Sequence, residues 1–334
     1  MPGAVRVGAR AYRPAVPIMV PPDTVAQALH VFGIDPQTAR PLDRGGAPDG
    51  LVLACRLGDE DAFCKLKPLP DEDTTGDLAR EHAVVALAEH LRASVPVMRH
   101  LPSTSGALVE LVTGHAVTVT ARAPGRHVTP EEALAPGFAR AWAGTLGRIH
   151  AATRTWVGDG DLNDWRGEHE QFVATCRDDE MGRLWAGLHA RLAELPTEPD
   201  GFGVVHNDLH HGNLLLAEDG TLTVLDLDVA GRHWYATDLA ILLVHPLWAL
   251  GERADEARRF VTTAVEAYLA QYPLPPERLA DVPLLAHYRM ALFVLAMQNE
   301  LGDASPPDWL RDLRAQLLAG RPLPFAAPLA ELGR

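Results

Sequence analysis

One short stretch of the chain carries an amide and two carboxylates at a spacing suited to metal-assisted chemistry. The motif His206-Asn207-Asp208 is followed by Asn213 and, after two apolar runs, by Asp226. Amide and carboxylate oxygens are ligands that Mg²⁺ accepts, and the ion keeps further positions for water and phosphate oxygens. A carboxylate beside such an ion, here Asp208, could act on a group held next to the metal.

A predicted hairpin brings two of these residues together. The dipeptide Asp219-Gly220 lies between apolar runs, which is the strongest short-range signal for a tight β-hairpin. With Asp219 and Gly220 as the two loop residues, Asn213 is directly opposite Asp226. Directly opposed residues have Cβ atoms about 4.5–5.5 Å apart. We therefore expect an amide oxygen and a carboxylate to converge on one point.

The pattern His206-x-Asp208-x₄-Asn213, followed by Asp226, resembles the catalytic loop and metal-binding Asp of the kinase superfamily. In detail it is similar to the aminoglycoside phosphotransferase-like small-molecule kinases, which read His-Gly-Asp followed by Asn and then an Asp-x-Asp segment. This chain has Asn207 where Gly is usual. It lacks the Arg and the Ala-Pro-Glu segment of protein kinases.

The resemblance implies a role for each residue. Asp208 would orient the hydroxyl of an acceptor and take its proton, while Asn213 and Asp226 would hold Mg²⁺. Asp228 would share a second metal ion or hydrogen-bond the loop. Asp238, at the start of the following helix, would cap that helix and brace the catalytic loop through backbone N–H groups.

The histidines of this stretch allow another interpretation. Closely spaced His and Asp residues bind zinc in metallo-hydrolases. Such a site would use His206, Asp208, His210 and His211, with further ligands downstream, but no downstream histidine has a recognisable ligand spacing. We expect His206 to brace the loop and expect His210 and His211 to be exposed.

A second group of candidate residues lies on a predicted hairpin formed by residues 51–57 and 62–67. Its turn, residues 58–61, would place Cys55 opposite Cys64. Phe63 and Lys65 share a face because strand side chains alternate. Phe63 could stack on adenine and Lys65 could meet phosphates, which resembles the nucleotide-binding lysine of the kinase small lobe.

Other residues could take the roles assigned to Lys65 and to its carboxylate partner. Lys67 lies on the same face but precedes Pro68, so Lys65 is preferred. In the family a helix Glu pairs with the lysine; Glu81 fits within the predicted helix 77–92, and Glu89 is the other possibility. A Gly-bearing loop before the first strand, residues 43–50, could lay backbone N–H groups over phosphates.

The order of elements predicts an α+β, two-lobed kinase-like fold. The small lobe would be an antiparallel sheet plus a helix, and the large lobe would be mainly helical with a catalytic β-hairpin. We place an N-terminal arm and short helix at 1–37, the small nucleotide-binding lobe at 38–122 and the large catalytic and substrate-binding lobe at 123–334. Thr129-Pro130-Glu131-Glu132 predicts a capped helix start in the large lobe.

The composition and net charge limit the kinds of partner that the protein is expected to bind. The net charge of −14 argues against nucleic acid or an anionic membrane as partners and is compatible with a cationic acceptor. Acidic residues at 159–168 and at 300–303 could contact such an acceptor, although a solvated helix face is the simpler interpretation of the first group. Three cysteines do not form a secreted disulfide framework, and no signal peptide or membrane span is evident, so we expect a cytoplasmic protein.

The leading functional hypothesis is an ATP- and Mg²⁺-dependent kinase that phosphorylates a hydroxyl of a small molecule. The acceptor class stays open among aminoglycoside-like antibiotics, amino alcohols, sugars and hydroxy-amino acids, and GTP remains an alternative to ATP. A nucleotide-binding pseudokinase acting through partners is the second hypothesis, and the His/Asp metallo-hydrolase is the third.

Overall fold

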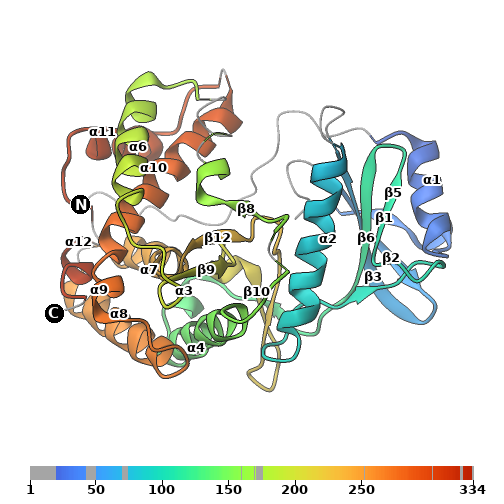
Figure 1. Ribbon diagram of the computed structural model, residues 1–334, viewed down its shortest axis with the longest axis horizontal. Coiled ribbons are helices and arrows are strands. Elements are labelled where there is room, and N and C mark those ends of the chain that lie inside the picture. Colours follow the sequence, from blue (N-terminus) through green and yellow to red (C-terminus); the bar gives the residue numbers. More distant parts are fainter. Residues whose placement is uncertain are drawn as a thin grey trace.

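The computed structural model confirms the predicted two-lobed α+β fold of the kinase-like class (Figure 1). One lobe is built on a large antiparallel sheet, and the other is mainly helical with two small sheets. Residues 43–49 of the predicted phosphate loop at 43–50 lie outside the residues that the structure describes. Those residues are 20–42, 50–69, 74–158, 160–168, 170, 176–251, 253–302, 304–323 and 326–332.

The small lobe is an antiparallel sheet between two helices. Its strands are ordered β1-β2-β3-β6-β4, and β5 pairs with the free part of β6. Figure 1 shows α2 on the side of the large lobe and α1 on the outer side. The elements are α1 (Pro22–Val31), η1 (Pro36–Thr38), β1 (Arg40–Pro41), β2 (Leu51–Leu57), β3 (Glu60–Pro68), α2 (Thr74–Leu91), β4 (His100–Leu101), β5 (Val109–Val112) and β6 (His115–Ala121).

Helix α1 is an integral part of this lobe. Leu29 and Phe32 are buried in the same apolar cluster as Leu53 of β2 and Val117 of β6. Without α1, the apolar side chains on the sheet face opposite α2 would be exposed to water. Helix α1 covers them. The short helix that the sequence analysis grouped with the N-terminal arm therefore packs on the sheet of the small lobe, while the lobe limits at 37 and 122 stay predictions.

The predicted register of the β2–β3 hairpin was wrong by two residues. Leu57 pairs with Glu60, so the loop is only Gly58-Asp59 and Cys55 faces Ala62 instead of Cys64. Gly58 has φ +60°, which a tight two-residue turn demands and which glycine adopts without strain. Both cysteines are buried free thiols, and burial raises the pKa of Cys64 to about 12.

The large lobe surrounds two small sheets with helices. One sheet has the order β11-β10-β7 and the other β8-β12-β9. The elements are β7 (Arg126–His127), α3 (Pro130–Ala133), α4 (Pro136–Thr153), β8 (Asn163–Asp164), α6 (Asp179–Leu192), β9 (Phe202–Val205), η2 (His211–Asn213), β10 (Leu214–Leu216), β11 (Leu222–Val224), β12 (Gly231–Trp234), α7 (Tyr235–Leu250), α8 (Ala254–Leu269), α9 (Pro276–Leu279), α10 (Val282–Leu301), α11 (Asp308–Leu318) and α12 (Ala326–Leu329).

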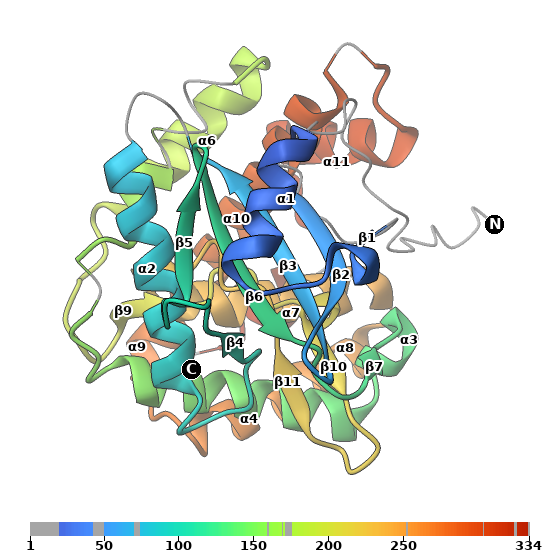
Figure 2. The ribbon, with the colours of Figure 1, turned by 90° about the vertical axis from the view of Figure 1, so that its right-hand side faces the viewer.

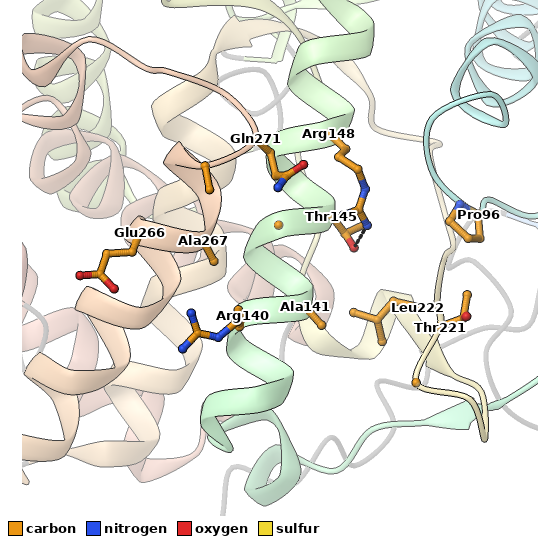
Figure 3. Close-up of a pocket in the computed structure, with 13 residues that line it drawn as sticks. Pro96, Arg140, Ala141, Thr145, Arg148, Thr221, Leu222, Glu266, Ala267 and Gln271 are labelled. Atoms are coloured by element: carbon orange, nitrogen blue, oxygen red, sulfur yellow. Dashed lines mark hydrogen bonds between the residues drawn. The ribbon is translucent and has the colours of Figure 1, made fainter.

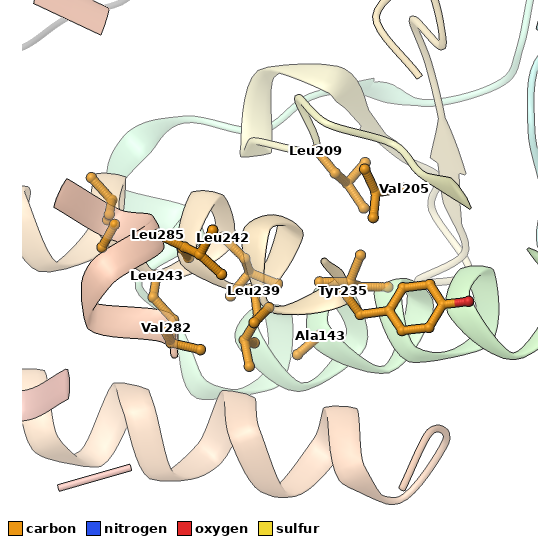
Figure 4. Close-up of a cluster of buried hydrophobic side chains, with 14 of the residues drawn as sticks. Ala143, Val205, Leu209, Tyr235, Leu239, Leu242, Leu243, Val282 and Leu285 are labelled. Carbon is orange, nitrogen blue, oxygen red and sulfur yellow. The ribbon is translucent and has the colours of Figure 1, made fainter. Parts of the chain in front are cut away.

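The core of the large lobe lies directly beneath the stretch that carries the candidate catalytic residues. Figure 4 shows Leu209, from that stretch, above Leu239 and Leu242 of α7 and Leu285 of α10. Residues 276–301 are long and apolar enough to span a membrane by composition, but α10 packs against α7 and α6 as a core helix. The stretch therefore rests on a well-packed apolar support.

The connection between the lobes is tied to the hairpin that follows the catalytic loop. Strand β7 pairs with β10, and Thr129 then opens α3 with the predicted capping box to Glu132. Gly125 has φ +108°, and a Cβ there would lie 2.8 Å from the backbone carbonyl of Leu216. Only glycine lets the interlobe connection approach the hairpin this closely.

Candidate active site

The loop that begins at His206 is held from below by a buried carboxylate. Asp238 is 0% exposed and accepts hydrogen bonds from the backbone N–H groups of His206 (2.8 Å) and Asn207 (2.7 Å). His150 Nε2 donates to the same carboxylate at 3.1 Å. Burial alone would raise the pKa of Asp238, but the hydrogen bond and charge of His150 lower it below its usual value. The carboxylate therefore fixes two successive backbone groups of the loop.

The structure confirms the bracing role expected of Asp238 and corrects its expected capping role. Helix α7 begins at Tyr235, so Asp238 lies inside its first turn with its carboxylate turned to the loop. His206 is also structural, as expected. Its ring is buried and its Nε2 lies 2.9 Å from the carbonyl oxygen of Leu225, which joins the loop to the hairpin.

Asn207 has a left-handed backbone conformation, with φ +67°. Glycine adopts this conformation without strain and asparagine is among the few other residues that tolerate it. The geometry explains why Gly is usual at this position of the motif and why Asn is an acceptable replacement. Its amide side chain then takes up a role that glycine could not have.

That role involves a polar cluster which the sequence interpretation missed. Arg289 of α10 donates to the backbone carbonyl oxygen of Asn207 (3.0 Å) and to its side-chain oxygen (3.1 Å). Glu168 accepts from Arg289 (2.9 Å) and from the Asn207 amide (3.3 Å). The three side chains come from distant parts of the sequence, so no local pattern pointed to them, and together they fix the residue just before Asp208.

Asp208 itself is accessible, with 40% of its side chain exposed. Asn213 Nδ2 lies 2.9 Å from its backbone carbonyl and 3.2 Å from its carboxylate. His210 Nε2 lies 3.6 Å from the same carboxylate. The carboxylate is thus oriented by neighbours on one side and open to solvent on the other.

The expectation that His210 and His211 are exposed was wrong. Both are half-buried, and His210 also accepts a hydrogen bond from the backbone of Gly212 through Nδ1. Burial, together with the charge of His210, lowers the pKa of His211 to about 4. These rings form part of the surface beside Asp208.

The hairpin exists, but its predicted register was wrong by one residue. Leu214 pairs with Val224, and Asn213 O accepts from the backbone N–H of Leu225, so Asn213 is not opposite Asp226. Of the three loop residues 218–220 only Gly220 has positive φ (+85°). A two-residue type I′ turn needs positive φ at both centres, whereas a three-residue loop needs it only at the glycine.

Asp226 nevertheless reaches the same region by a turn of its own. It has φ +56°, a conformation that costs free energy in a residue with a Cβ and that often marks functional sites. Burial of its carboxyl group raises its pKa most, the charges of Asp228 and Asp208 raise it further, and Lys65 and His206 oppose them. Three carboxylates therefore influence one another here.

This donor set fits a divalent cation. Burial is the largest cause of the raised pKa of Asp226, and the charges of Asp228 and Asp208 add to it; a hard cation would neutralise those charges. The amide of Asn213 contacts Asp208 at the edge of the same group. A zinc site built on His206 finds less support, because both ring nitrogens are already engaged: Nε2 lies 2.9 Å from the carbonyl oxygen of Leu225, and Nδ1 accepts from the backbone N–H of Asp208 at 3.4 Å. The metallo-hydrolase hypothesis is therefore not retained.

Glu81 pairs with Lys67, the alternative candidate, and not with the preferred Lys65. Lys67 Nζ lies 2.6 Å from Glu81, whereas Lys65 forms an ion pair with Asp228 of the large lobe. Both lysines lie on one face of β3 with Phe63, as predicted, because Ala62, Cys64 and Leu66 point into the core. The expected Lys65–Glu81 pair was therefore wrong.

Asp228 connects the lobes through a second contact. Arg80 of α2 donates to its backbone carbonyl oxygen at 2.8 Å. Burial alone would raise the pKa of Asp228, but the charges of Lys65, Lys67 and Arg80 lower it. The two neighbouring carboxylates thus have opposite pKa shifts, since Asp228 has cationic partners from the small lobe and Asp226 has few.

At least four hollows are lined by large-lobe residues, and two of them include residues of the catalytic loop or of the hairpin after it. A small cavity of about 60 Å³ is lined by Arg80, Glu168, Asn207 and Arg232, among others. A larger one of about 500 Å³ lies between α4, α8 and the tip of the hairpin, where Figure 3 shows Arg140 and Gln271. None of the residues that line the larger hollow is among the candidate catalytic or metal-binding side chains.

Comparisons with known proteins find a similar sequence family and similar folds. A profile of the Phosphotransferase enzyme family matches residues 48–281. An amicoumacin kinase of Bacillus subtilis (strain 168) is 26% identical over 257 residues, covering 69% of this chain and 73% of that protein.

Among solved structures, the amicoumacin kinase hAmiN in complex with AMP-PNP, Ca²⁺ and Ami aligns with a TM-score of 0.78 at 21% identity, covering 90% of this chain and 93% of that chain. A microcompartment-associated aminopropanol kinase aligns with a TM-score of 0.65 at 20% identity, covering 93% and 96%. A spectinomycin phosphotransferase in complex with ADP and spectinomycin aligns with a TM-score of 0.60 at 11% identity, covering 94% and 98%. At these identities the structural likeness shows the fold.

Proposed function

The chain belongs to the Phosphotransferase enzyme family, and we propose that it transfers the γ-phosphoryl group of ATP to a hydroxyl group of a small molecule in the presence of Mg²⁺. The observation that carries the proposal is the arrangement around Asp208. This carboxylate is exposed, oriented by Asn213 and next to the acidic pair Asp226 and Asp228.

Asp208 would act directly on the acceptor. Its carboxylate accepts a hydrogen bond from the hydroxyl, which orients the oxygen for in-line attack, and takes the proton as the new bond forms. Asp238 and Arg289 hold the backbone of His206 and Asn207, directly before Asp208, so little reorganisation of the base is needed. Asn213 and Asp226 would hold Mg²⁺, with Asp228 as a further ligand. The ion, when bound, would neutralise charge on the phosphate oxygens.

The nucleotide would lie along the face of β3. Phe63 offers an aromatic surface for the base, and the two lysines that follow on the same face offer charge for the phosphates. Lys67 is the lysine held by Glu81, so it fits the role that the resemblance gives to a Glu-paired lysine. Lys65 would pass from Asp228 to a phosphate oxygen. Either ATP or GTP would fit this description, and ATP is our proposal.

The acceptor is proposed to be an antibiotic or a metabolite that carries a hydroxyl group. Relatives by fold are named for acceptors as different as amicoumacin, aminopropanol and spectinomycin. The net charge of −14 is compatible with a cationic acceptor. We further propose that the protein acts in the cytoplasm.

The test is a screen of ATP consumption with these acceptors, repeated with Asp208→Asn. We expect the variant to lose turnover by at least about 100-fold, as when a general base is removed, while nucleotide binding measured by calorimetry is kept. Asp219→Asn, at the exposed hairpin tip, is the matched control and should behave as wild type. Turnover by Asp208→Asn near the wild-type rate would refute the assignment.

A further inference from the structure

A line of partly exposed side chains on α10 begins at the catalytic loop. Arg289 contacts Asn207, next to Asp208, and Phe293, Met297 and Glu300 follow it by one, two and three turns. Residues at this spacing share one face of a helix. All four are only half-buried. The helix face that fixes the loop therefore continues outward as a surface that neighbouring elements leave partly uncovered.

Aromatic rings from three helices converge along this surface. His210 lies 3.6 Å from the Asp208 carboxylate, and its ring centroid is 5.8 Å from that of His245 of α7. His245 is followed by Phe293 of α10 at 6.5 Å. Phe293 stacks on Trp309 of α11 at 6.1 Å with an interplanar angle of 28°. These separations are those of interacting aromatic pairs, so the rings form one continuous series from the catalytic carboxylate outward.

The rings of this series reach the surface of the large lobe. His245 is exposed, and Phe293 and Trp309 are half-buried. Part of each residue is therefore accessible from solvent, beside the catalytic carboxylate.

We propose that His245, Phe293 and Trp309, which we call the aromatic wall, bind a flat conjugated ring of the acceptor while the acceptor hydroxyl reaches Asp208. The inference rests on the proposed kinase function and narrows its acceptor to molecules with a planar ring. Sugars and short amino alcohols would leave the wall in contact with water. A planar ring would cover it and gain stacking contacts that a puckered ring of the same size cannot make.

The test uses two probes that differ only in planarity, phenylalaninol and its ring-saturated counterpart cyclohexylalaninol. Both carry the same hydroxyl and amine. Binding is measured by saturation-transfer NMR titration in the presence of the nonhydrolysable nucleotide AMP-PNP and Mg²⁺, so no turnover is required. We expect wild type to bind the planar probe about fivefold more tightly than the saturated one, the order of one aromatic stacking contact.

Trp309→Leu and Phe293→Leu keep apolar volume but remove the ring face, and each should abolish this preference. Trp156→Leu is the matched control, because Trp156 is also half-buried but packs against His90 of α2, and it should keep the preference. No preference in wild type, no binding of either probe, or a preference that survives Trp309→Leu would overturn the inference.

The two proposals can fail separately. Asp208→Asn should keep the planar preference while losing turnover, because the wall and the base are different residues. Loss of the preference with turnover intact would remove the aromatic wall and leave the kinase proposal standing. Turnover that survives Asp208→Asn, with the preference unchanged, would refute the role of Asp208 and leave the aromatic wall standing.

Discussion

Residues 206–208 and residues 226–228 both contain a left-handed non-glycine residue, but the structure supports the two turns with different kinds of contact. The first turn is fixed by hydrogen bonds from within the large lobe, to Asp238, Arg289 and Glu168. The second has two carboxylates whose cationic partners come from the small lobe. The first turn is satisfied as it stands, whereas the second carries negative charge that its surroundings do not fully neutralise.

The difference matches what each turn would have to do. A carboxylate that orients an acceptor must be positioned before the acceptor arrives, since misplacement by about 1 Å can cost 100-fold in rate. A segment that binds a cation must instead retain charge that attracts the ion, even at a cost in stability. The first turn therefore supplies a preorganised base, and the second supplies negative charge that attracts a cation.

The largest effect should come from removing the support of the first turn. Asp238→Ala leaves two backbone N–H groups and His150 without their buried acceptor, and we expect a loss of about 3–5 kcal/mol in the free energy of unfolding. Urea denaturation measures it. Asp219→Ala at the exposed hairpin tip is the control. A loss below about 1 kcal/mol would mean that the first turn is not held as described.

For the second turn we expect a large loss of activity without a loss of stability. Asp226→Asn should lower turnover by at least about 100-fold, equivalent to about 2.7 kcal/mol in the barrier. Its free energy of unfolding without metal should not fall, because the raised pKa shows that the folded protein disfavours the ionised carboxylate. Steady-state kinetics and urea denaturation at pH 8 test both parts, and a destabilised Asp226→Asn would break the comparison.

The smallest expected effect is on how the free energy of unfolding depends on pH. His233, behind the first turn, is buried, and burial with the charge of Arg289 lowers its pKa to about 3. In the unfolded chain its pKa is about 6.5, so below that pH the unfolded state binds a proton that the folded state does not. Stability should therefore fall as pH drops below about 6.5, with a contribution of up to about 1.4 kcal/mol per pH unit.

His233→Gln should have a shallower decline between pH 6 and pH 5, measured by urea denaturation at closely spaced pH values. Above pH 7 its curve should run parallel to that of wild type, because His233 is neutral in both states there. His82→Gln, on the exposed side of α2, serves as the control. An unchanged slope in His233→Gln would show that this imidazole does not titrate as inferred.

Much of the fold could be predicted because local signals agreed. Apolar alternation and Gly-bearing turns located β2, β3 and the hairpin of β10 and β11, and the cap at Thr129 located α3. Registers were less predictable, because they depend on which loop residue takes positive φ. One glycine in the left-handed conformation, Gly220, was enough to shift Asn213 away from Asp226.

The site was predictable only where its residues lie close together in sequence. The spacing from His206 to Asp226 pointed to Asp208, and the family resemblance pointed to the bracing by Asp238. Arg289 escaped notice, and Glu168 was considered only as an acceptor contact within the acidic group 159–168, because both reach Asn207 only through tertiary packing. The lysine pairing failed for a related reason: β3 offers two lysines on one face, and the position of α2 decides which of them meets Glu81.

The ion pair between Lys65 and Asp228 has a consequence for ligand affinity. The ammonium group that would meet a phosphate already has an anionic partner, so an incoming nucleotide replaces one counter-charge by another. The free energy of binding is then a difference between two similar attractions. Added salt weakens both of them, so we infer that nucleotide affinity depends on ionic strength less than the number of positive charges on β3 would suggest.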